Sequence, residues 1–527
     1  MAPFFVLNFL LEPMLFLKMG KTLRLILGDQ LNAQHSWFST VNNEYTFVMI
    51  ESREEGSYAP HHIQKVVGIF SAMRQFAHSL KSQGHQLHYH KILDSTEANL
   101  RTVLASIAQQ YGAERIELQE PDEWRLREDL EQLKDEGFKI TWCSSEHFIS
   151  TREEFQGLFE GKKTFLMETF YRALRRRTGI LMDMAQPAGG KWNYDAQNRK
   201  KLPKNHLPPP PFVPSTDVSA ELKDALAAQL PTIGKLENPK HFYWPTTPTQ
   251  AWEIFDHWLQ YGLPSFGDYQ DALTTKSWSL YHSRISFALN TKMIQPLDVC
   301  QRVEAHYRAN PEVPLNAVEG FIRQILGWRE FMRCVYWHRM PEFADENFFG
   351  FDRKLPQWFW NGETKMKCLS HTIGQSLNHG YAHHIQRLMV TGNFALLAGI
   401  DPDEVDLWYL GIYIDAFEWV EITNTRGMSQ YADGGWIATK PYVSSANYMK
   451  KMGDYCDQCF YNPKTKTEDD SCPFNALYWN FFDSQRDKLQ SNFRLGMVYR
   501  TYDKMNADVK AGIREKAQSL LDNINTL

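Results

Sequence analysis

The chain has 527 residues, 57 of them Lys or Arg and 62 Asp or Glu, which gives a formal net charge of -5. This charge excludes a globally basic nucleic-acid-binding protein, so any contact with DNA must use a local basic patch. The 7 cysteines are too few for a disulfide scaffold and odd in number, so we expect a reduced, cytoplasmic protein. The length predicts two or three domains.

Residues 1–20 are apolar but lack the features of a targeting signal. Glu12 and Pro13 interrupt the apolar run, and no basic region precedes it. The run is also too short to span a bilayer. We therefore expect a disordered extension and no membrane partner.

Residues 21–151 are predicted to form an α/β, Rossmann-like domain with a parallel sheet. Segments of helical periodicity separate five short apolar runs, at 23–27, 47–50, 86–90, 115–118 and 139–142. In such folds ligands bind at the carboxyl ends of the strands. Asp29 follows the first strand, and Glu55 and Tyr58 follow the second, so these residues form a candidate ligand site.

Residues 152–240 are predicted to be a basic linker between two domains. Positions 162 to 206 hold eleven Lys or Arg against three Asp or Glu. Arg175–Arg177 and the stretch 191–204 are suited to neutralise DNA phosphates, with Lys191, Trp192 and Arg199 as candidate DNA contacts. A solvated helix face would have a similar composition, and this alternative stays open.

Residues 241–527 are predicted to be all-helical, with long helical segments at 314–340, 364–400 and 474–490. Trp, Tyr, His and Arg stand where a simple bundle would have Leu. We therefore expect a polar, planar group inside this half.

Cys456, Cys459 and Cys472 form a C-x2-C-x12-C-P pattern, with Cys368 available upstream. Two thiolates two residues apart can bind one centre from a single turn, and a third thiolate before proline is typical of iron-sulfur ligation. Four thiolates also suit structural zinc, and spacing alone does not separate the two.

Three segments resemble the flavin-binding half of photolyases: GFIRQILGWREFMR at 320–333, YAHHIQRLMVTGNFALLAG at 381–399 and DAFEWVE at 415–421. GGKWNYD at 189–195, GDQL at 28–31 and the cysteine set extend the resemblance over residues 22 to about 515. The bacterial iron-sulfur branch of the photolyase and cryptochrome family, which includes prokaryotic (6-4) photolyases, is the most similar.

The resemblance implies three cofactors. These are a noncovalent FAD in the helical half, one [4Fe-4S] cluster, and a 6,7-dimethyl-8-ribityllumazine antenna in the α/β domain. Cys368, Cys456, Cys459 and Cys472 would hold the cluster, and Asp29, Glu55 and Tyr58 the antenna, with Ile69 beside them. A divalent cation is a further candidate cofactor.

The resemblance also assigns roles around the flavin. His282, Ser283 and Ser286 match a turn that holds the FAD phosphates, and Arg329, Arg387 and Asp415 are further FAD-binding candidates. Glu421 stands where the family has an Asn near flavin N5, so a carboxylate there is a candidate proton-exchanging group. His383 and His384, predicted to lie in one helix, match the histidine pair that provides the proton donor to a (6-4) lesion.

Aromatic residues complete the predicted site. Trp360, Trp408 and Tyr409 match electron-transfer positions of the family. Gln324, Trp328, Tyr442 and Tyr448 are candidate lesion contacts, and the spacing of Gln324 and Trp328 predicts that they share a helix face.

Together these features predict a light-dependent (6-4) DNA photolyase that acts on UV-damaged DNA as a monomer. Two alternatives remain from the sequence. One is a blue-light signalling cryptochrome with the same cofactors and no repair activity. The other is a light-independent DNA-binding iron-sulfur protein, which would contain no flavin.

Overall fold

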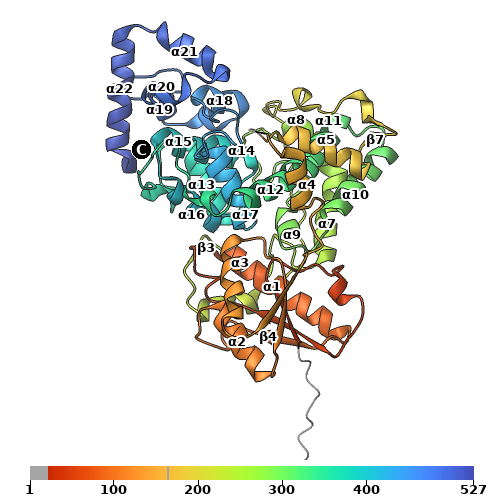
Figure 1. Cartoon of the computed structure of the whole chain (residues 1–527). Coiled ribbons are helices and arrows are strands. Elements are labelled where there is room, and N and C mark those ends of the chain that lie inside the picture. Colours follow the sequence, from red (N-terminus) through yellow and green to blue (C-terminus); the bar gives the residue numbers. More distant parts are fainter. Residues whose placement is uncertain (1–21, 163–164) are drawn as a thin grey trace, which may run out of the picture.

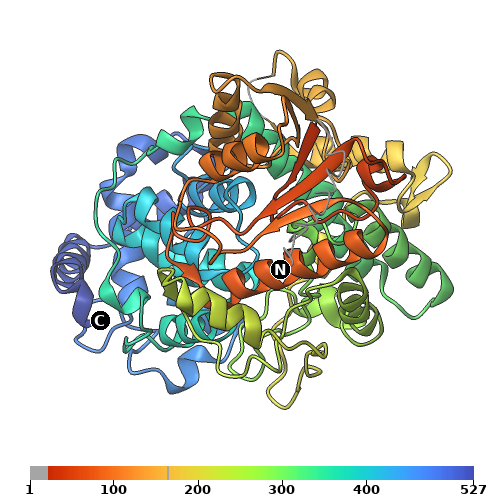
Figure 2. The same ribbon diagram turned by 90° about the horizontal axis from the view of Figure 1, so that it is seen from below.

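The computed structural model describes residues 22–162 and 165–527, so the predicted extension at 1–20 lies outside the described residues. Figure 1 shows an α/β part at the bottom and helices above it in two groups. In the view from below, the sheet lies in front of the helical half with helix α1 beside it (Figure 2). The expected fold class is confirmed.

Within the described residues, a 5-stranded parallel sheet forms the centre of the α/β part. Its strands are β1 (Thr22–Ile26), β2 (Tyr45–Ile50), β4 (Leu87–His90), β5 (Arg115–Gln119) and β6 (Lys139–Cys143), in the order β4-β2-β1-β5-β6. All five strands predicted from apolar runs are therefore confirmed. The order reverses beside β1, where ligands of doubly wound folds bind.

Both faces of the sheet are buried, because helices cover each of them. Alternate strand residues point to opposite sides and so pack with different helices. Leu23 and Leu25 pack with α2 (Leu100–Gln110) and α3 (Trp124–Glu131). Ile26 and Met49 pack with α1 (Ile63–Ser82) and join the core of the helical half. The two halves of the chain thus share one continuous apolar core.

The helical half contains many short and medium helices. They are α4 (Arg152–Phe159), α5 (Met167–Thr178), α6 (Ser219–Ala227), α7 (Pro248–Tyr261), α8 (Leu263–Tyr269), α9 (Ser286–Asn290), α10 (Pro296–Ala309), α11 (Leu315–Ile322), α12 (Glu330–Arg339), α13 (Lys367–His379), α14 (His384–Gln386), α15 (Asn393–Ala398), α16 (Pro402–Ile412), α17 (Glu418–Ile422), α18 (Ala446–Met452), α19 (Pro473–Ser484), α20 (Arg486–Leu489), α21 (Gly496–Asp503) and α22 (Ala507–Asp522). Two-residue strands β3 (His61–His62) and β9 (Thr232–Ile233), and β7 (Met182–Asp183) and β8 (Gln186–Pro187), form two small sheets.

The first part of the predicted linker is folded. Helices α4 and α5 bury Phe155, Phe170 and Tyr171 in the core of the helical half. Apolar residues at helical spacing on these two segments, which the basic composition masked, explain their packing. The segment from 191 to 217 holds no α-helix.

All three predicted long helices are interrupted, and the one at 474–490 divides at Gln485 between α19 and α20. Residues 323–329, between α11 and α12, form a π-helical turn. Gly380, with a left-handed φ of 61°, ends α13, and His383 has extended backbone. The prediction that both histidines lie in one helix is therefore wrong for His383, which precedes α14, whereas His384 is the first residue of that helix.

Candidate active site and cofactor pockets

A cavity in the helical half brings together most of the predicted flavin and lesion residues. It has about 1150 Å³ of space between its walls, part of it open to solvent. The predicted residues that line it are His282, Ser283, Ser286, Gln324, His384, Arg387, Tyr409, Asp415 and Glu421. In the described residues, π-helical turns at 323–329, 387–392 and 423–429 each supply part of the wall. Such turns are frequent at functional sites.

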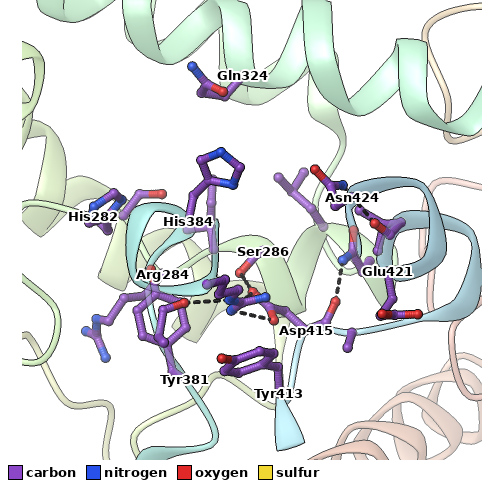
Figure 3. A pocket seen from close by; sticks show the side chains of 18 of the residues that line it. His282, Arg284, Ser286, Gln324, Tyr381, His384, Tyr413, Asp415, Glu421 and Asn424 are labelled. Carbon is purple, nitrogen blue, oxygen red and sulfur yellow. Dashed lines mark hydrogen bonds and ion pairs between the residues drawn. The ribbon is translucent and has the colours of Figure 1, made fainter. Parts of the chain in front are cut away.

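The Arg387–Asp415 pair lies on one side of the cavity (Figure 3). Arg387 Nη2 is 2.9 Å from Asp415 Oδ1, and the guanidinium lies 3.8 Å from the centre of the Tyr413 ring. Ser286 Oγ donates to Asp415 Oδ2 at 2.6 Å, and Asn290 donates to the Asp415 carbonyl at 2.8 Å. The carboxylate is therefore fixed, and the Ser286 hydroxyl, predicted to contact an FAD phosphate, donates its proton to this carboxylate.

His384 and Gln324 lie on the other side of the cavity from Asp415 (Figure 3). Partial removal from bulk water and the positive charges of Arg387 and Arg199 lower the pKa of His384, although its side chain keeps solvent-exposed surface, so the neutral imidazole is favoured at pH 7 in the free protein. His383 does not line the cavity. Its ring stacks on that of His282, with centroids 4.8 Å apart.

Glu421 offers the cavity a carboxyl group whose environment favours the protonated form. Burial and the nearby Asp406 carboxylate raise the pKa of Glu421 well above its ordinary value. Its Oε1 is buried and has no hydrogen-bond partner within the described residues. A buried oxygen of this kind fits a ligand that forms hydrogen bonds, such as the edge of an isoalloxazine ring.

Arg199 connects the basic segment with the cavity. Its positive charge acts on the pKa of His384, Tyr442 and Tyr448, so Arg199 lies near these three residues, of which only His384 lines the cavity. Arg199 Nη2 is 2.5 Å from Asp195, and its Nε is 3.2 Å from an Asp271 carboxylate oxygen.

The other predicted basic residues divide into two groups. Arg175 is buried and donates to the carbonyls of residues 180 and 181, so it stabilises the fold and cannot contact phosphate. Arg177 pairs with Glu154. Arg176 is exposed, and its guanidinium lies 4.7 Å from the centre of the Trp192 ring. Lys191, which directly precedes Trp192 in the sequence, is also exposed.

Two predicted residues lie outside the cavity. Arg329 is buried, donates to the carbonyl of Leu289 and contacts His147, so it lies behind the cavity wall. Trp328 contacts Phe331 and does not line the cavity, whereas Gln324 does. Both residues lie within the π-helical turn at 323–329.

The predicted electron-transfer residues occupy graded depths. Tyr409 lines the cavity, and the fully buried Trp408 has its ring centroid 5.3 Å away. Phe359 lies 5.1 Å from Trp408, and the next residue, Trp360, is 37% exposed. Aromatic side chains therefore lead from the cavity wall toward solvent.

The four predicted cysteine ligands line one small pocket with Tyr455 and Tyr461. They come from α13, from a short turn at 455–458 and the residue after it, and from the residue before α19. Burial and the nearby thiols raise the pKa of Cys368 well above its ordinary value and that of Cys456 to about 11. Because a raised pKa disfavours the thiolate form, these cysteines become thiolates only when they bind a cationic centre.

A third cavity, with about 780 Å³ between its walls, lies at the carboxyl ends of β1 and β2. It holds the predicted antenna residues Asp29, Glu55, Tyr58 and Ile69. Arg125 donates to both carboxylate oxygens of Glu55, at 2.7 and 2.8 Å, which fixes that side chain.

Several lining residues were missed from the sequence. In the main cavity they include Tyr381, Tyr413 and Asn424, and in the antenna cavity His61, Lys65 and Glu123. Lys65 gave the clearest signal, because a lysine on the apolar face of a predicted helix needs buried partners. Its Nζ donates to the Leu410 carbonyl at 3.0 Å.

Comparisons with known proteins agree with this geometry. A family model described as "Deoxyribodipyrimidine photo-lyase-related protein" matches residues 24–241. A "(6-4) photolyase" of Agrobacterium fabrum is 44% identical over 503 residues, which cover 94% of this chain and 98% of that protein.

Two solved structures share the fold. A class III photolyase from Agrobacterium tumefaciens has a TM-score of 0.56 at 18% identity, over 90% of this chain and 87% of that one. A cryptochrome from Synechocystis sp. PCC6803 has a TM-score of 0.56 at 14% identity, over 89% of this chain and 93% of that one. No helix in the described part of the chain is long and apolar enough to cross a membrane. The near full-length similarity shows that this chain belongs to the photolyase and cryptochrome family, on the branch of the bacterial (6-4) photolyases.

Proposed function

We propose that the protein is a light-dependent DNA photolyase that reverses pyrimidine-pyrimidone (6-4) photoproducts in UV-damaged DNA. The observation that carries this proposal is one cavity with His384 and Gln324 on one side and the buried Arg387–Asp415 pair on the other. The similarity to a relative called a (6-4) photolyase supports it over nearly the whole chain.

The cavity residues fit a flavin. When bound, reduced and photoexcited FAD would supply the electron that starts repair. Arg387 would offset negative charge on the ring, held in place by Asp415, and Glu421, whose raised pKa favours the protonated form, would donate a hydrogen bond at the ring edge. Ser283 and His282 would lie along the rest of the cofactor.

His384 would act on the lesion. Its imidazole lines the cavity and stands opposite the flavin-binding pair, which is the place for a group that passes a proton to the damaged base. DNA phosphates would oppose the positive charges that lower its pKa, and so favour the protonated form.

DNA would approach over Arg199, Tyr442 and Tyr448, with Lys191, Trp192 and Arg176 extending the contact. Extruding a damaged pair costs a few kcal/mol, and aromatic rings around an opening can receive the unstacked bases. Gln324 would contact the lesion from the wall opposite Asp415.

The cysteine pocket would hold a [4Fe-4S] cluster. Four cysteines line one pocket. Within the described residues, however, no three or more His, Cys, Asp or Glu side chains lie close enough together to bind a single metal ion. A cubic cluster is wider than one ion and takes its thiolates from farther apart, which favours the cluster over zinc. Iron and acid-labile sulfide in equal amounts in the purified protein would agree, and stoichiometric zinc would contradict the assignment.

The antenna cavity would hold a ribityllumazine, whose polar ring and ribityl chain suit Asp29, Glu55 and Tyr58. Mass spectrometry of the released chromophores tests this assignment. A divalent cation, the monomeric state and the cytoplasmic location are also proposals, for which EDTA-treated assays, light scattering and cell fractionation are the tests.

The decisive experiment illuminates the purified, reduced protein with an oligonucleotide that carries a defined (6-4) photoproduct. Repair under blue light and none in the dark is expected. The fold shared with a cryptochrome makes a signalling photoreceptor the second candidate, and a flavin-loaded protein without repair would favour it.

A further inference from the structure

A buried hydrogen-bond network joins the cysteine pocket to the segment that carries the catalytic histidine. Its centre is Gln386, the last residue of α14, which is 1% exposed. Gln386 Oε1 accepts from the backbone N–H of His383 at 3.0 Å and from Gln375 Nε2 at 3.0 Å. Gln386 Nε2 donates to Gln375 Oε1 and to the Tyr455 hydroxyl, both at 3.0 Å.

These contacts use every hydrogen-bonding site of the Gln386 amide. Its oxygen has two lone pairs and its nitrogen two hydrogens, and each has a buried partner. The orientation of the amide is therefore determined, since a flipped amide would place a donor against the His383 N–H. Gln375 adds a second anchor by donating to the Tyr381 carbonyl at 3.1 Å.

The segment from 381 to 383 needs such anchors. Helix α13 ends at the left-handed Gly380, and α14 has only 3 residues before a π-helical turn begins. A helix of one turn is not stable on its own in water, so side-chain contacts must define where it starts. His384 is its first residue, and its position in the cavity depends on that start.

The other end of the network lies in the cysteine pocket. Tyr455 is 1% exposed, lines this pocket, and immediately precedes Cys456. One residue of the proposed cluster site thus contacts the histidine segment through a single glutamine.

We propose that Gln386 and Tyr455 are positioning residues for repair: they hold the start of α14, and with it His384, at a fixed place relative to the cysteine pocket. This inference rests on the proposed function for its effect on repair. The cysteine site thereby contributes to repair through position.

Three variants test the proposal. Tyr455→Phe removes one hydroxyl and keeps the ring that lines the pocket. Gln386→Leu removes all four contacts of the amide without touching a cysteine. Gln386→Glu, protonated in this buried site, keeps the acceptor for the His383 N–H and a donor for Tyr455, and so should restore function. Tyr499→Phe is the control, because its buried hydroxyl has no partner within the described residues.

The first measurement is amide hydrogen exchange of the peptide that spans residues 380–388, in the holoprotein with FAD and metal content measured. Exchange should be at least about tenfold faster in Gln386→Leu and faster in Tyr455→Phe, and unchanged in Gln386→Glu and the control. This readout does not depend on activity, so it remains decisive even if the protein repairs no (6-4) lesion.

The second measurement is the single-turnover repair rate at saturating DNA over a range of pH. Tyr455→Phe and Gln386→Leu should repair about tenfold more slowly with unchanged DNA affinity and a shifted pH profile, because a misplaced histidine lowers the rate after binding. If Tyr455→Phe loses iron, the comparison of Gln386→Leu with Gln386→Glu decides the question. Wild-type exchange and wild-type repair in Gln386→Leu would overturn the proposal. Faster exchange in Gln386→Leu, together with no repair of the (6-4) lesion by the wild type, would overturn only the proposed function.

Discussion

Lys292 joins the two halves of the protein through a buried ionic contact, and its replacement should be strongly destabilising. Its Nζ is 2.6 Å from Asp122 Oδ2 and 3.3 Å from Asp29 Oδ2, and the side chain is 0% exposed. Lys292→Met keeps the length and introduces no charge, but it leaves two buried carboxylates without a cation. Breaking a buried pair in this way costs about 3–5 kcal/mol.

The cost should depend on pH. Burial raises the pKa of Asp29 to about 6 from 3.8, and Lys292 opposes this rise. Because the folded state binds this proton more tightly than the unfolded state, the contribution of Asp29 to stability falls as pH rises from about 4 through 6. Without Lys292 the pKa of Asp29 rises further. The penalty of Lys292→Met should therefore be smaller at pH 5 than at pH 8.

Urea unfolding followed by circular dichroism, at pH 5 and pH 8, measures both effects from the midpoint and slope. Asp122→Asn in the Lys292→Met background removes one of the two charges and should recover part of the loss. A loss below about 1 kcal/mol, or an equal loss at both pH values, would refute the assignment of Lys292 as the neutralising group.

Three further predictions concern the main cavity. His384→Ala should lower (6-4) repair by about 10²–10⁴-fold while FAD stays bound, and retained repair would remove His384 from the mechanism. Glu421→Gln, which mimics the protonated acid, should bind FAD like the wild type at pH 7 but abolish the pH dependence of photoreduction; an unchanged pH profile would exclude proton exchange by Glu421. Trp408→Phe should slow photoreduction in vitro, and it should also lower the folded stability because it leaves a cavity and removes the hydrogen bond to the Phe359 carbonyl. A wild-type rate would assign the ring to packing.

The parallel sheet followed from short-range features of the sequence. Each strand is a run of apolar residues between helical segments, and the burial of both faces requires no knowledge of distant partners. The cysteine spacing likewise predicted one site, because Cys456 and Cys459 lie two residues apart in a turn and Cys472 precedes a proline that starts a helix.

The site was predictable where a family motif names the residue, as for His384, Arg387 and Asp415. The prediction failed where the backbone departs from an ideal helix. Trp328 and Arg329 lie within the π-helical turn at 323–329 and do not line the cavity, and helical spacing carries no sign of such a turn.

The sequence by itself determined the order of elements, the kinds of side chain available and the family of the chain. Tertiary structure alone decided which of these side chains meet. Lys292 contacts Asp29, and Gln386 contacts Tyr455. The residues of each pair are far apart along the chain, and only the packing of the folded molecule brings them together. It also decided their chemistry, because the lowered pKa of His384 and the raised pKa of Glu421 arise from the surroundings and charges that other segments bring near.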